Sequence, residues 1–462
     1  MEPNANGGAT RRLAEFAAAL TYEDLPDAAV ALIKQVILDT VGCCLAATTL
    51  GAGCREVIQA TRNLASKPEA TILGSSLKVA AADAAFANGA LAHALNYDAF
   101  GPEVGHVGVA CLVAPVAMAE AAGGISGQRF LAAAAVAAEV TSRVTLAITR
   151  TGRRPSEKFL AGQLLSYFGC AAGAGNIHGL NADEMLSALG LALMQASGSM
   201  QMVIDGDQPA KAIYGAFPNH GGVRAAQLSA AGLGAKCDAL EGDAGLYGMV
   251  YGGEYDHGAL TDRLGTDFAL LATGFKPWPT SVEVHPFIEA ARRIAGDGLD
   301  IAGIGEVKII GHGSIRPWCE PVAERRRPQN AASAANSIPF GVAKALCHGD
   351  VTLADFTDAG LADEAALGIA GRCVYRAEDG MAGGTLHITT RDGAAREVHV
   401  SSPPGHPSRP LPRDRLLAKF HDCCRYAANP LRTGQAEALV DLIENLEDVP
   451  DIGVLARMAA GA

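Results

Sequence analysis

A polar segment, LNYDAFGPEVGHVGV (residues 95–109), interrupts two apolar, alanine-rich stretches and carries the first side chains that could do chemistry. Gly101, Pro102 and Gly105 favour a loop, and His106 stands where the next helix is expected to begin. An imidazole titrates near neutral pH and can accept or donate a proton, although a histidine here can equally be a capping residue. We expect this segment to form one wall of a small-molecule site, with His106 as its proton-transfer group.

A second polar stretch, DGDQPAKAIYGAFPNHGG (residues 205–222), separates two helical patterns. Its glycines and prolines favour an irregular segment. Lys211, Tyr214, Asn219 and His220 can each bind a carboxylate. Taken alone, the stretch fits either a binding segment or an exposed loop.

A third segment, GFKPWPTSVEVHP (residues 274–286), lies at a change in sequence character. Its prolines stiffen the backbone beside Lys276, so this lysine could reach a cleft between two domains. Arg316 and the run at 325–327 add positive charge further along the chain. An arginine presents a fork of donors that matches a carboxylate, but a run of three is more often a solvated edge.

The sequence lacks the motifs of nucleotide-dependent and metal-dependent enzymes. It contains no GxGxxG in a βαβ context, no Walker A loop, no HExxH and no GxSxG. We therefore expect neither a cofactor nor a metal site. The remaining chemistry is proton transfer by histidine, lysine, aspartate and tyrosine.

Composition narrows the class of protein and its partners. The formal net charge of −12 argues against a nucleic-acid partner. The eleven cysteines show no zinc-site spacing, and the N-terminal residues lack the apolar core of a signal peptide, which together favour a cytoplasmic protein with reduced thiols. The alanine-rich runs contain charges and glycines at short intervals, so we expect no membrane span.

Periodicity predicts a mainly α protein with an inserted α+β region. Helical patterns fill the chain to about residue 272 and return after the proline-rich SSPPGHPSRPLP. Between them, residues 306–312 have strand composition, residues 383–402 resemble a hairpin around an Asp-Gly turn, and residues 337–349 resemble a helix. We expect a large helical domain from residues 1–272 and 406–462, with a smaller α+β lid at 273–405. A ligand is then expected in the cleft between them.

Taken together, these segments resemble the MmgE/PrpD family, whose members include 2-methylcitrate dehydratases, cis-aconitate decarboxylases and iminodisuccinate epimerases. The resemblance runs along the whole chain and in the same order. It is carried by LAEFAAALTYEDLP, ILDTVGCCLAA, FANGALAHALNYD, LEGDAGLYG, GFKPWPTSVEVHPFIEAA, RPQNAASAANSIPFGVAKALCHGD and GHPSRPLPRDRLLAKF. It implies the same helical domain with an inserted lid, a homodimer, no organic cofactor or required metal, and a small di- or tricarboxylate as substrate.

The resemblance also implies roles for individual residues. His106 falls on the family's loop histidine, and Lys211 and Lys276 fall on its two lysines. His106 is then expected to move the proton, the two lysines to hold the carboxylate oxygens, and Asp98 to orient the imidazole or act as its partner. The residues expected to contact the substrate are Asn96, Tyr97, Phe100, Leu160, Tyr214, Ser281, Arg316 and Phe340.

Several of these positions depart from the family pattern. Asn96 stands in place of an aspartate, Phe100 in place of a threonine and Leu160 in place of a histidine. Tyr214 replaces another histidine, and Phe340 occupies a position that can carry tyrosine. Because these changes remove hydrogen-bonding groups, we expect a less polar substrate than a tricarboxylate, with Phe100, Phe159 and Phe340 lining its pocket.

The function expected from the sequence is that of a cofactor-independent lyase. It would dehydrate or decarboxylate a small carboxylic acid by proton transfer next to a carboxylate. Two alternatives remain open: an isomerase or epimerase that returns the proton to carbon, and a catalytically inactive relative that binds a metabolite.

Overall fold

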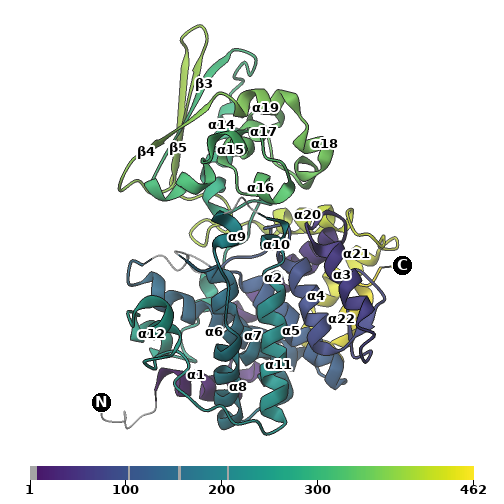
Figure 1. Cartoon of the computed structure of the whole chain (residues 1–462). Coiled ribbons are helices and arrows are strands. Elements are labelled where there is room, and N and C mark those ends of the chain that lie inside the picture. Colours follow the sequence, from purple (N-terminus) through teal and green to yellow (C-terminus); the bar gives the residue numbers. More distant parts are fainter. Residues whose placement is uncertain (1–7, 102–104, 154–157, 205–207, 462) are drawn as a thin grey trace.

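The computed structural model describes residues 8–101, 105–153, 158–204 and 208–461 (Figure 1). Most of this chain is helical, and one four-stranded sheet stands apart from the helices of the larger part. The prediction of a mainly α protein with a small α+β region is confirmed at this level.

The larger part, here called the helical body, is built from both ends of the chain. Its C-terminal helices pack against α2 and α5 (Figure 1). It also holds a short antiparallel pair, β1 (Ala70–Thr71) and β2 (Lys78–Val79), which the helical pattern did not predict. The helices are α1 (Ala9–Ala19), α2 (Asp27–Leu50), α3 (Cys54–Asn63), α4 (Ala81–His93), α5 (Val107–Ala122), α6 (Gly127–Thr149), α7 (Ala161–His178), α8 (Ala182–Gln195), α9 (Gln201–Ile204), α10 (Pro209–Ala212), α11 (Ala216–Ala230), α12 (Leu246–Tyr251), α13 (His257–Thr261), α20 (Arg413–Cys424), α21 (Gln435–Glu444) and α22 (Gly453–Met458).

Small residues let the central helices approach closely. Helix α7 packs against α5, α6, α8 and α11. A Cβ atom added at Gly169 of α7 would lie 2.5 Å from the backbone oxygen of Ala137 in α6, so no larger residue fits there. The abundant alanine and glycine therefore bring the helices together, and loops at their ends can meet at one place.

The smaller part, here called the lid, contains the four-stranded sheet in the order β4-β3-β5-β6. Strand β3 (Ile304–Gly311) pairs in parallel with β4 (Cys373–Ala377) and antiparallel with β5 (Gly384–Thr390), which pairs with β6 (Ala395–Val400). The predicted strand at 306–312 and the predicted hairpin are confirmed, whereas β4 was not predicted. The lid helices are α14 (His285–Gly296), α15 (Val322–Arg326), α16 (Ala331–Ala335), α17 (Ile338–His348), α18 (Asp358–Leu361) and α19 (Glu364–Ala370).

The two parts have separate hydrophobic cores. One large cluster takes its buried residues from 9–275 and 416–459, and a second takes them from 278–400. Helix α14 contacts β5 and β6 of the sheet and α17 of the lid. The chain therefore passes from one core to the other in the segment around Lys276.

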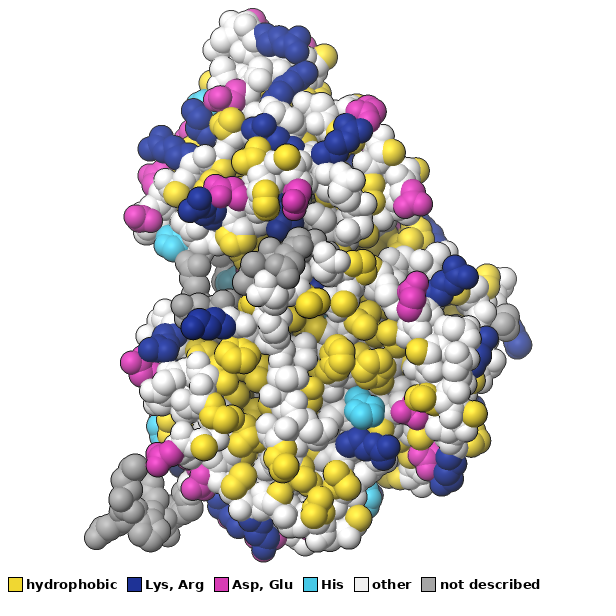
Figure 2. All heavy atoms as spheres, viewed as in Figure 1, with side chains coloured by type: hydrophobic (Ala, Val, Ile, Leu, Met, Phe, Trp, Pro, Cys, Tyr) yellow, Lys and Arg dark blue, Asp and Glu magenta, His cyan; other side chains and the backbone are white. Residues whose placement is uncertain are grey.

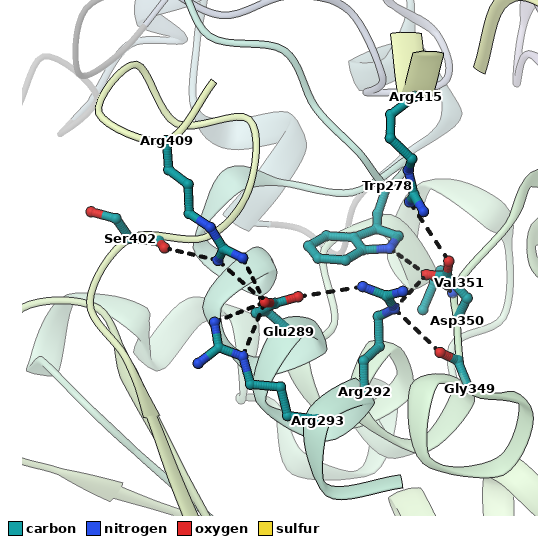
Figure 3. A network of polar contacts seen from close by, with 10 residues as sticks. All are labelled: Trp278, Glu289, Arg292, Arg293, Gly349, Asp350, Val351, Ser402, Arg409 and Arg415. Atoms are coloured by element: carbon teal, nitrogen blue, oxygen red, sulfur yellow. Dashed lines mark hydrogen bonds and ion pairs between the residues drawn. The ribbon is translucent and has the colours of Figure 1, made fainter. Parts of the chain in front are cut away.

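Ion pairs join the lid to the segment that leads back into the helical body (Figure 3). Glu289 of α14 accepts hydrogen bonds from Arg293 at 2.8 Å and from Arg409 at 3.2 Å. Asp350 accepts from the indole of the fully buried Trp278 at 2.6 Å and pairs with Arg292 and Arg415. Trp278 follows Lys276 by two residues, so this network fixes one end of the segment that carries the lysine.

Among the residues that the structure describes, two helices, α2 and α6, are long and apolar enough to cross a membrane, but most of each lies in the protein interior. Of their most apolar 18-residue stretches, 72% in α2 and 94% in α6 is buried.

Apolar side chains also gather on the surface of the helical body that Figure 2 shows. Exposed large apolar residues of α8, α9 and α11 are Met194, Met202, Phe217 and Leu228.

Candidate active site

Asp98 joins two histidines from different elements. Its Oδ2 lies 2.7 Å from Nδ1 of His106, the residue before α5, and its Oδ1 lies 3.1 Å from Nδ1 of His93, the last residue of α4. Helix α4 ends at this loop and α5 begins after it, so both imidazoles meet the same carboxylate. Asp98 is 0% exposed, and the two imidazole rings are 4.3 Å apart between centroids.

The surroundings determine the charges of this cluster. Burial by itself would raise the pKa of Asp98, but the charges and hydrogen bonds of His106 and His93 lower its pKa well below the usual value. Burial, with help from the charge of His106, lowers the pKa of His93 to about 3. Asp98 is therefore an ionised acceptor, and His93 is a neutral imidazole that donates to it.

His106 is held by one nitrogen and leaves the other available. Because Nδ1 faces an ionised carboxylate, Nδ1 donates to it, and Nε2 is the nitrogen that can exchange a proton with another group. Nε2 has no hydrogen-bond partner in the described part of the chain. The side chain of His106 is 17% exposed, whereas that of His93 is 2% exposed. Among the three, His106 is thus the group that can reach a substrate.

Lys276 approaches the same loop from the junction segment. Its ammonium donates to the side-chain oxygen of Asn96 at 2.6 Å and to the Asn96 backbone oxygen at 2.9 Å. Asn96 has a φ of 50°, a left-handed conformation that asparagine tolerates better than most residues, which turns both oxygens toward the lysine. The pKa of Lys276 is lowered to about 8. Burial is the largest cause and the charge of Lys211 adds to it, whereas the charge of Asp98 acts in the opposite direction.

Lys211 lies on α10, which contacts α16 of the lid. Its positive charge lowers the pKa of both Lys276 and His93, which places it within electrostatic reach of each. The structure therefore brings His106, Asp98, Lys276 and Lys211, all predicted from separate segments, to one region where the helical body meets the lid.

Tyr214 covers the histidine pair from the turn before α11. Its ring centroid lies 4.0 Å from that of His93 and 5.7 Å from that of His106. Within the predicted irregular segment, residues 205–207 lie outside the described residues and 209–212 form α10. Asn219 and His220 lie inside α11, so the loop prediction was wrong for them. Buried Asn219 donates to the backbone oxygen of Gly215, and the His220 ring lies against Phe86.

A buried lysine that the sequence interpretation missed joins the backbone of two segments of the site. Lys419 of α20 donates to the backbone oxygens of Tyr97 at 2.6 Å and of Lys276 at 3.1 Å. Its Nζ lies 2.6 Å from Asp39 of α2 and 3.8 Å from the Tyr97 ring centroid. Tyr97 in turn donates to the backbone oxygen of Pro277 at 3.2 Å, so its role in the structure is to clamp the loop to the junction segment.

Other residues expected to contact the substrate lie at the edge of the cluster. Phe100 exchanges two backbone hydrogen bonds with Gly274, and its ring fills the space above that glycine. Leu160 precedes α7 and is 8% exposed. Phe159 pairs with Ser199 through an isolated backbone bridge.

Three expected contacts fall outside the cluster. Arg316 pairs with Glu320 at 2.8 Å, and its side chain is 69% exposed. Phe340 is 0% exposed and packs inside the lid, so the structure does not bring it to a pocket wall. The Ser281 hydroxyl donates to Glu283 beside it in the chain.

His93, Asp98 and His106 also form the one group of potential metal ligands found among the described residues. One ligand atom from each lies within 4.8 Å of the others. Both imidazole Nδ1 atoms already face the carboxylate, and Lys211 and Lys276 place positive charge nearby, which opposes a cation. The arrangement fits a hydrogen-bonded proton-transfer group better than a metal centre.

Two hollows of about 470 Å³ each lie elsewhere on the surface. One is lined by residues of α21, α22 and the connection between them, and the other by α2, α20 and α21. Neither contains a residue of the cluster. We place the candidate site at the cluster because ionisable groups from five segments converge there.

Comparison with known proteins agrees with this architecture. Residues 11–257 match the MmgE/PrpD N-terminal domain, and residues 278–447 match the MmgE/PrpD C-terminal domain. The chain is 24% identical over 453 residues to human cis-aconitate decarboxylase, covering 95% of this chain and 91% of that protein. It is 24% identical over 477 residues to cis-aconitate decarboxylase from Aspergillus terreus, covering 97% and 96% of the two chains. The predicted resemblance is confirmed: the chain belongs to the MmgE/PrpD family.

Proposed function

We propose that this protein is a cofactor-independent lyase that acts on a small carboxylic acid by proton transfer at a carbon next to a carboxylate. The observation that carries the proposal is the His106 imidazole, which Asp98 holds by Nδ1 and whose Nε2 has no partner in the described part of the chain. The similarity to cis-aconitate decarboxylases supports a small-carboxylate lyase.

The site residues divide the work between proton transfer and charge. Nε2 of His106 accepts or returns the proton, while Asp98 keeps the imidazole in the required tautomer and stabilises it once charged. Lys211 and Lys276 attract carboxylate oxygens and stabilise the negative charge that develops on them. Positioned proton transfer of this kind contributes about 10²–10⁴-fold to a rate.

Two lyase reactions fit these groups. In a dehydration, His106 takes a proton from carbon and the electron pair forms the double bond. The protonated His106 then gives this proton to the departing hydroxyl group, which leaves as water. In a decarboxylation, the bond to the leaving carboxylate breaks, CO₂ departs, and a protonated His106 returns a proton to the carbon. Asn96 beside Lys276, and Leu160 at the edge of the cluster, favour a substrate with fewer charged groups than a tricarboxylate.

The assembly and location follow the same reasoning. We propose a homodimer in which the exposed apolar residues of α8, α9 and α11 contact a second copy. Light scattering after size-exclusion chromatography should give a molar mass twice that of one chain. The Phe217→Asp variant should have the molar mass of a single chain. We also propose a cytoplasmic location, because all eleven cysteines are unpaired thiols. We propose no nucleic-acid partner because the formal net charge is −12, and no membrane partner because α2 and α6 are mostly buried.

Turnover of a panel of acids tests the function. Purified protein is incubated with cis-aconitate, 2-methylcitrate and less charged analogues, and release of CO₂ or formation of a double bond is followed. His106→Ala should lower kcat at least about 100-fold while the melting temperature is kept. His178→Ala, at the exposed end of α7, serves as the matched control.

The outcomes separate the alternatives. Deuterium uptake from solvent without loss of CO₂ or water would make the protein an epimerase or isomerase. Binding of an acid without any reaction would make it an inactive relative. Activity of His106→Ala within a few-fold of wild type would remove His106 from the mechanism, and rapid turnover of 2-methylcitrate or cis-aconitate would refute the less polar substrate.

A further inference from the structure

Gly162, in the first turn of α7, leaves space that two site residues fill. A Cβ atom added there would lie 2.6 Å from the Tyr214 hydroxyl oxygen and 2.8 Å from Cδ2 of His106. Both distances are too short for any side chain to fit without movement. The hydroxyl of Tyr214 and the Nε2 edge of His106 therefore both face the start of α7.

The Tyr214 hydroxyl has no hydrogen-bond partner among the described residues, although its residue is largely buried. The residue is 6% exposed, and its hydroxyl makes no hydrogen bond to a residue in the described ranges. Burial, followed by the negative charge of Asp98, raises the pKa of Tyr214 well above its usual value, so the group keeps its proton and remains a donor. A donor left unpaired in this position points to a ligand that accepts its hydrogen bond.

The start of α7 supplies further donors at the same place. The N–H groups of Gln163 and Leu164 bond to the backbone oxygen of Leu160, so those of Ala161 and Gly162 are the ones left for a ligand. The helix dipole adds partial positive charge there. Leu160, the residue before α7, has no side chain that could cap these groups. Its own N–H bonds to the backbone oxygen of Gly198 at 3.1 Å, which holds the entry to the 18-residue helix in place.

We propose that the Tyr214 hydroxyl and the first turn of α7 bind one carboxylate of the substrate next to His106. This inference rests on the proposed function and adds the element that orients the acid. One carboxylate oxygen accepts from the tyrosine and the other from the helix N–H groups. The neighbouring carbon then lies beside the Nε2 edge of His106, where its proton can be taken or returned.

The same geometry makes Gly162 and Tyr214 a specificity-determining pair. Tyr214→Phe removes one hydrogen bond to a charged group, which corresponds to a loss of roughly 10- to 100-fold in affinity for the carboxylate. Gly162→Ala places a methyl group on the tyrosine and histidine and should lower affinity at least as much. Tyr214→Phe leaves His106 and Asp98 in place and should keep the His106 tautomer, whereas Gly162→Ala also presses on the imidazole.

Binding of unreactive acids tests the subsite. The full chain is titrated by calorimetry with butyrate, succinate and propane-1,2,3-tricarboxylate, and with the neutral amide of each acid that binds. Tyr255→Phe and Gly368→Ala serve as controls, because the Tyr255 ring stacks on Tyr247 rather than on a residue of the cluster and a Cβ at Gly368 meets nothing within 4 Å. Thermal unfolding of each variant checks the fold.

Each outcome bears on one proposal. If wild type binds an acid but not its amide, and Tyr214→Phe weakens the acid about 10-fold or more with an unchanged melting temperature, the subsite is supported. If wild type binds the acid and both Tyr214→Phe and Gly162→Ala bind it equally well, the subsite is refuted while the proposed function stands. If wild type neither binds nor converts any of the acids, the proposed function fails and the subsite fails with it.

Discussion

Replacing Asn96 by aspartate tests the charge balance around Lys276. In the wild-type protein the buried ammonium faces two uncharged oxygens of Asn96, and burial lowers its pKa from 10.5 to about 8. An opposite charge within a few ångströms raises the pKa of a lysine by about 1–3 units. A carboxylate in place of the amide, 2.6 Å from the ammonium, should therefore bring the pKa of Lys276 to between about 9 and 11.

This change in pKa appears as a change in stability with pH. Between about pH 8 and 10.5 the unfolded chain holds a proton on Lys276 that the folded protein has lost, so the free energy of unfolding rises with pH across this window. One pKa unit corresponds to about 1.4 kcal/mol, and the lysine is only partly titrated at both ends of the window, so it contributes a rise of about 2 kcal/mol between about pH 8 and pH 10. In Asn96→Asp the rise should be about half of that or less, because deprotonation of the folded protein starts at higher pH.

Urea unfolding between about pH 7 and pH 10 measures the effect. Lys276→Met lacks the titrating group and supplies the reference, so the difference between wild type and this variant isolates the lysine. Asn63→Asp, exposed on α3, controls for the added charge. If Asn96→Asp shows the same pH dependence as wild type, the account of Lys276 is wrong. Once a substrate is known, the alkaline limb of its pH profile should move upward by at least about one unit in Asn96→Asp.

Further predictions concern the groups around this lysine. Asp98→Asn should lower kcat at least about 100-fold, because an amide no longer selects the His106 tautomer; a stopped assay that shows near wild-type kcat would contradict this role. Lys419→Met leaves Asp39 buried without its counter-ion and should lower the free energy of unfolding by about 3–5 kcal/mol, measured in urea, whereas adding Asp39→Leu should recover much of the loss. Gly169→Ala forces α7 from α6 and should cost about 1–3 kcal/mol, visible as a lower melting temperature; an unchanged value would show that the helices adjust freely.

Much of the fold was predictable because its signals are local. The periodicity of α2, α5 and α6, and the alternation in β5 and β6, each depend on residues close together in the chain. Strand β4 was missed because it is five residues long and partly exposed, so its pattern is weak. Its parallel pairing with β3 joins residues 66 positions apart, such as Val307 and Cys373. The second half of the segment at 205–222 was taken for a loop, because its glycines and proline outweighed the helical pattern of α11.

The residue types of the candidate site were predictable, but the hydrogen bonds and ion pairs between them were not. His106, Lys211 and Lys276 were singled out by residue type and by the polar segments around them. His93 was missed although a signal existed, since it is a lone histidine in an alanine-rich helix five residues before Asp98. Lys419 and Asp39 gave no signal, because each looks like a surface charge until α20 packs on α2.

What the sequence determined by itself was the family, the helical character and the residue types able to move a proton, since these depend on local order along the chain. Only the tertiary structure decided that Asp98 is shared by two imidazoles, that Lys276 faces an amide, and that Gly162 opens the start of α7 to Tyr214. It also excluded Arg316 and Phe340 from the cluster. The physical reason is that pKa values and hydrogen-bond partners depend on distances of a few ångströms between segments, which packing sets and local sequence does not.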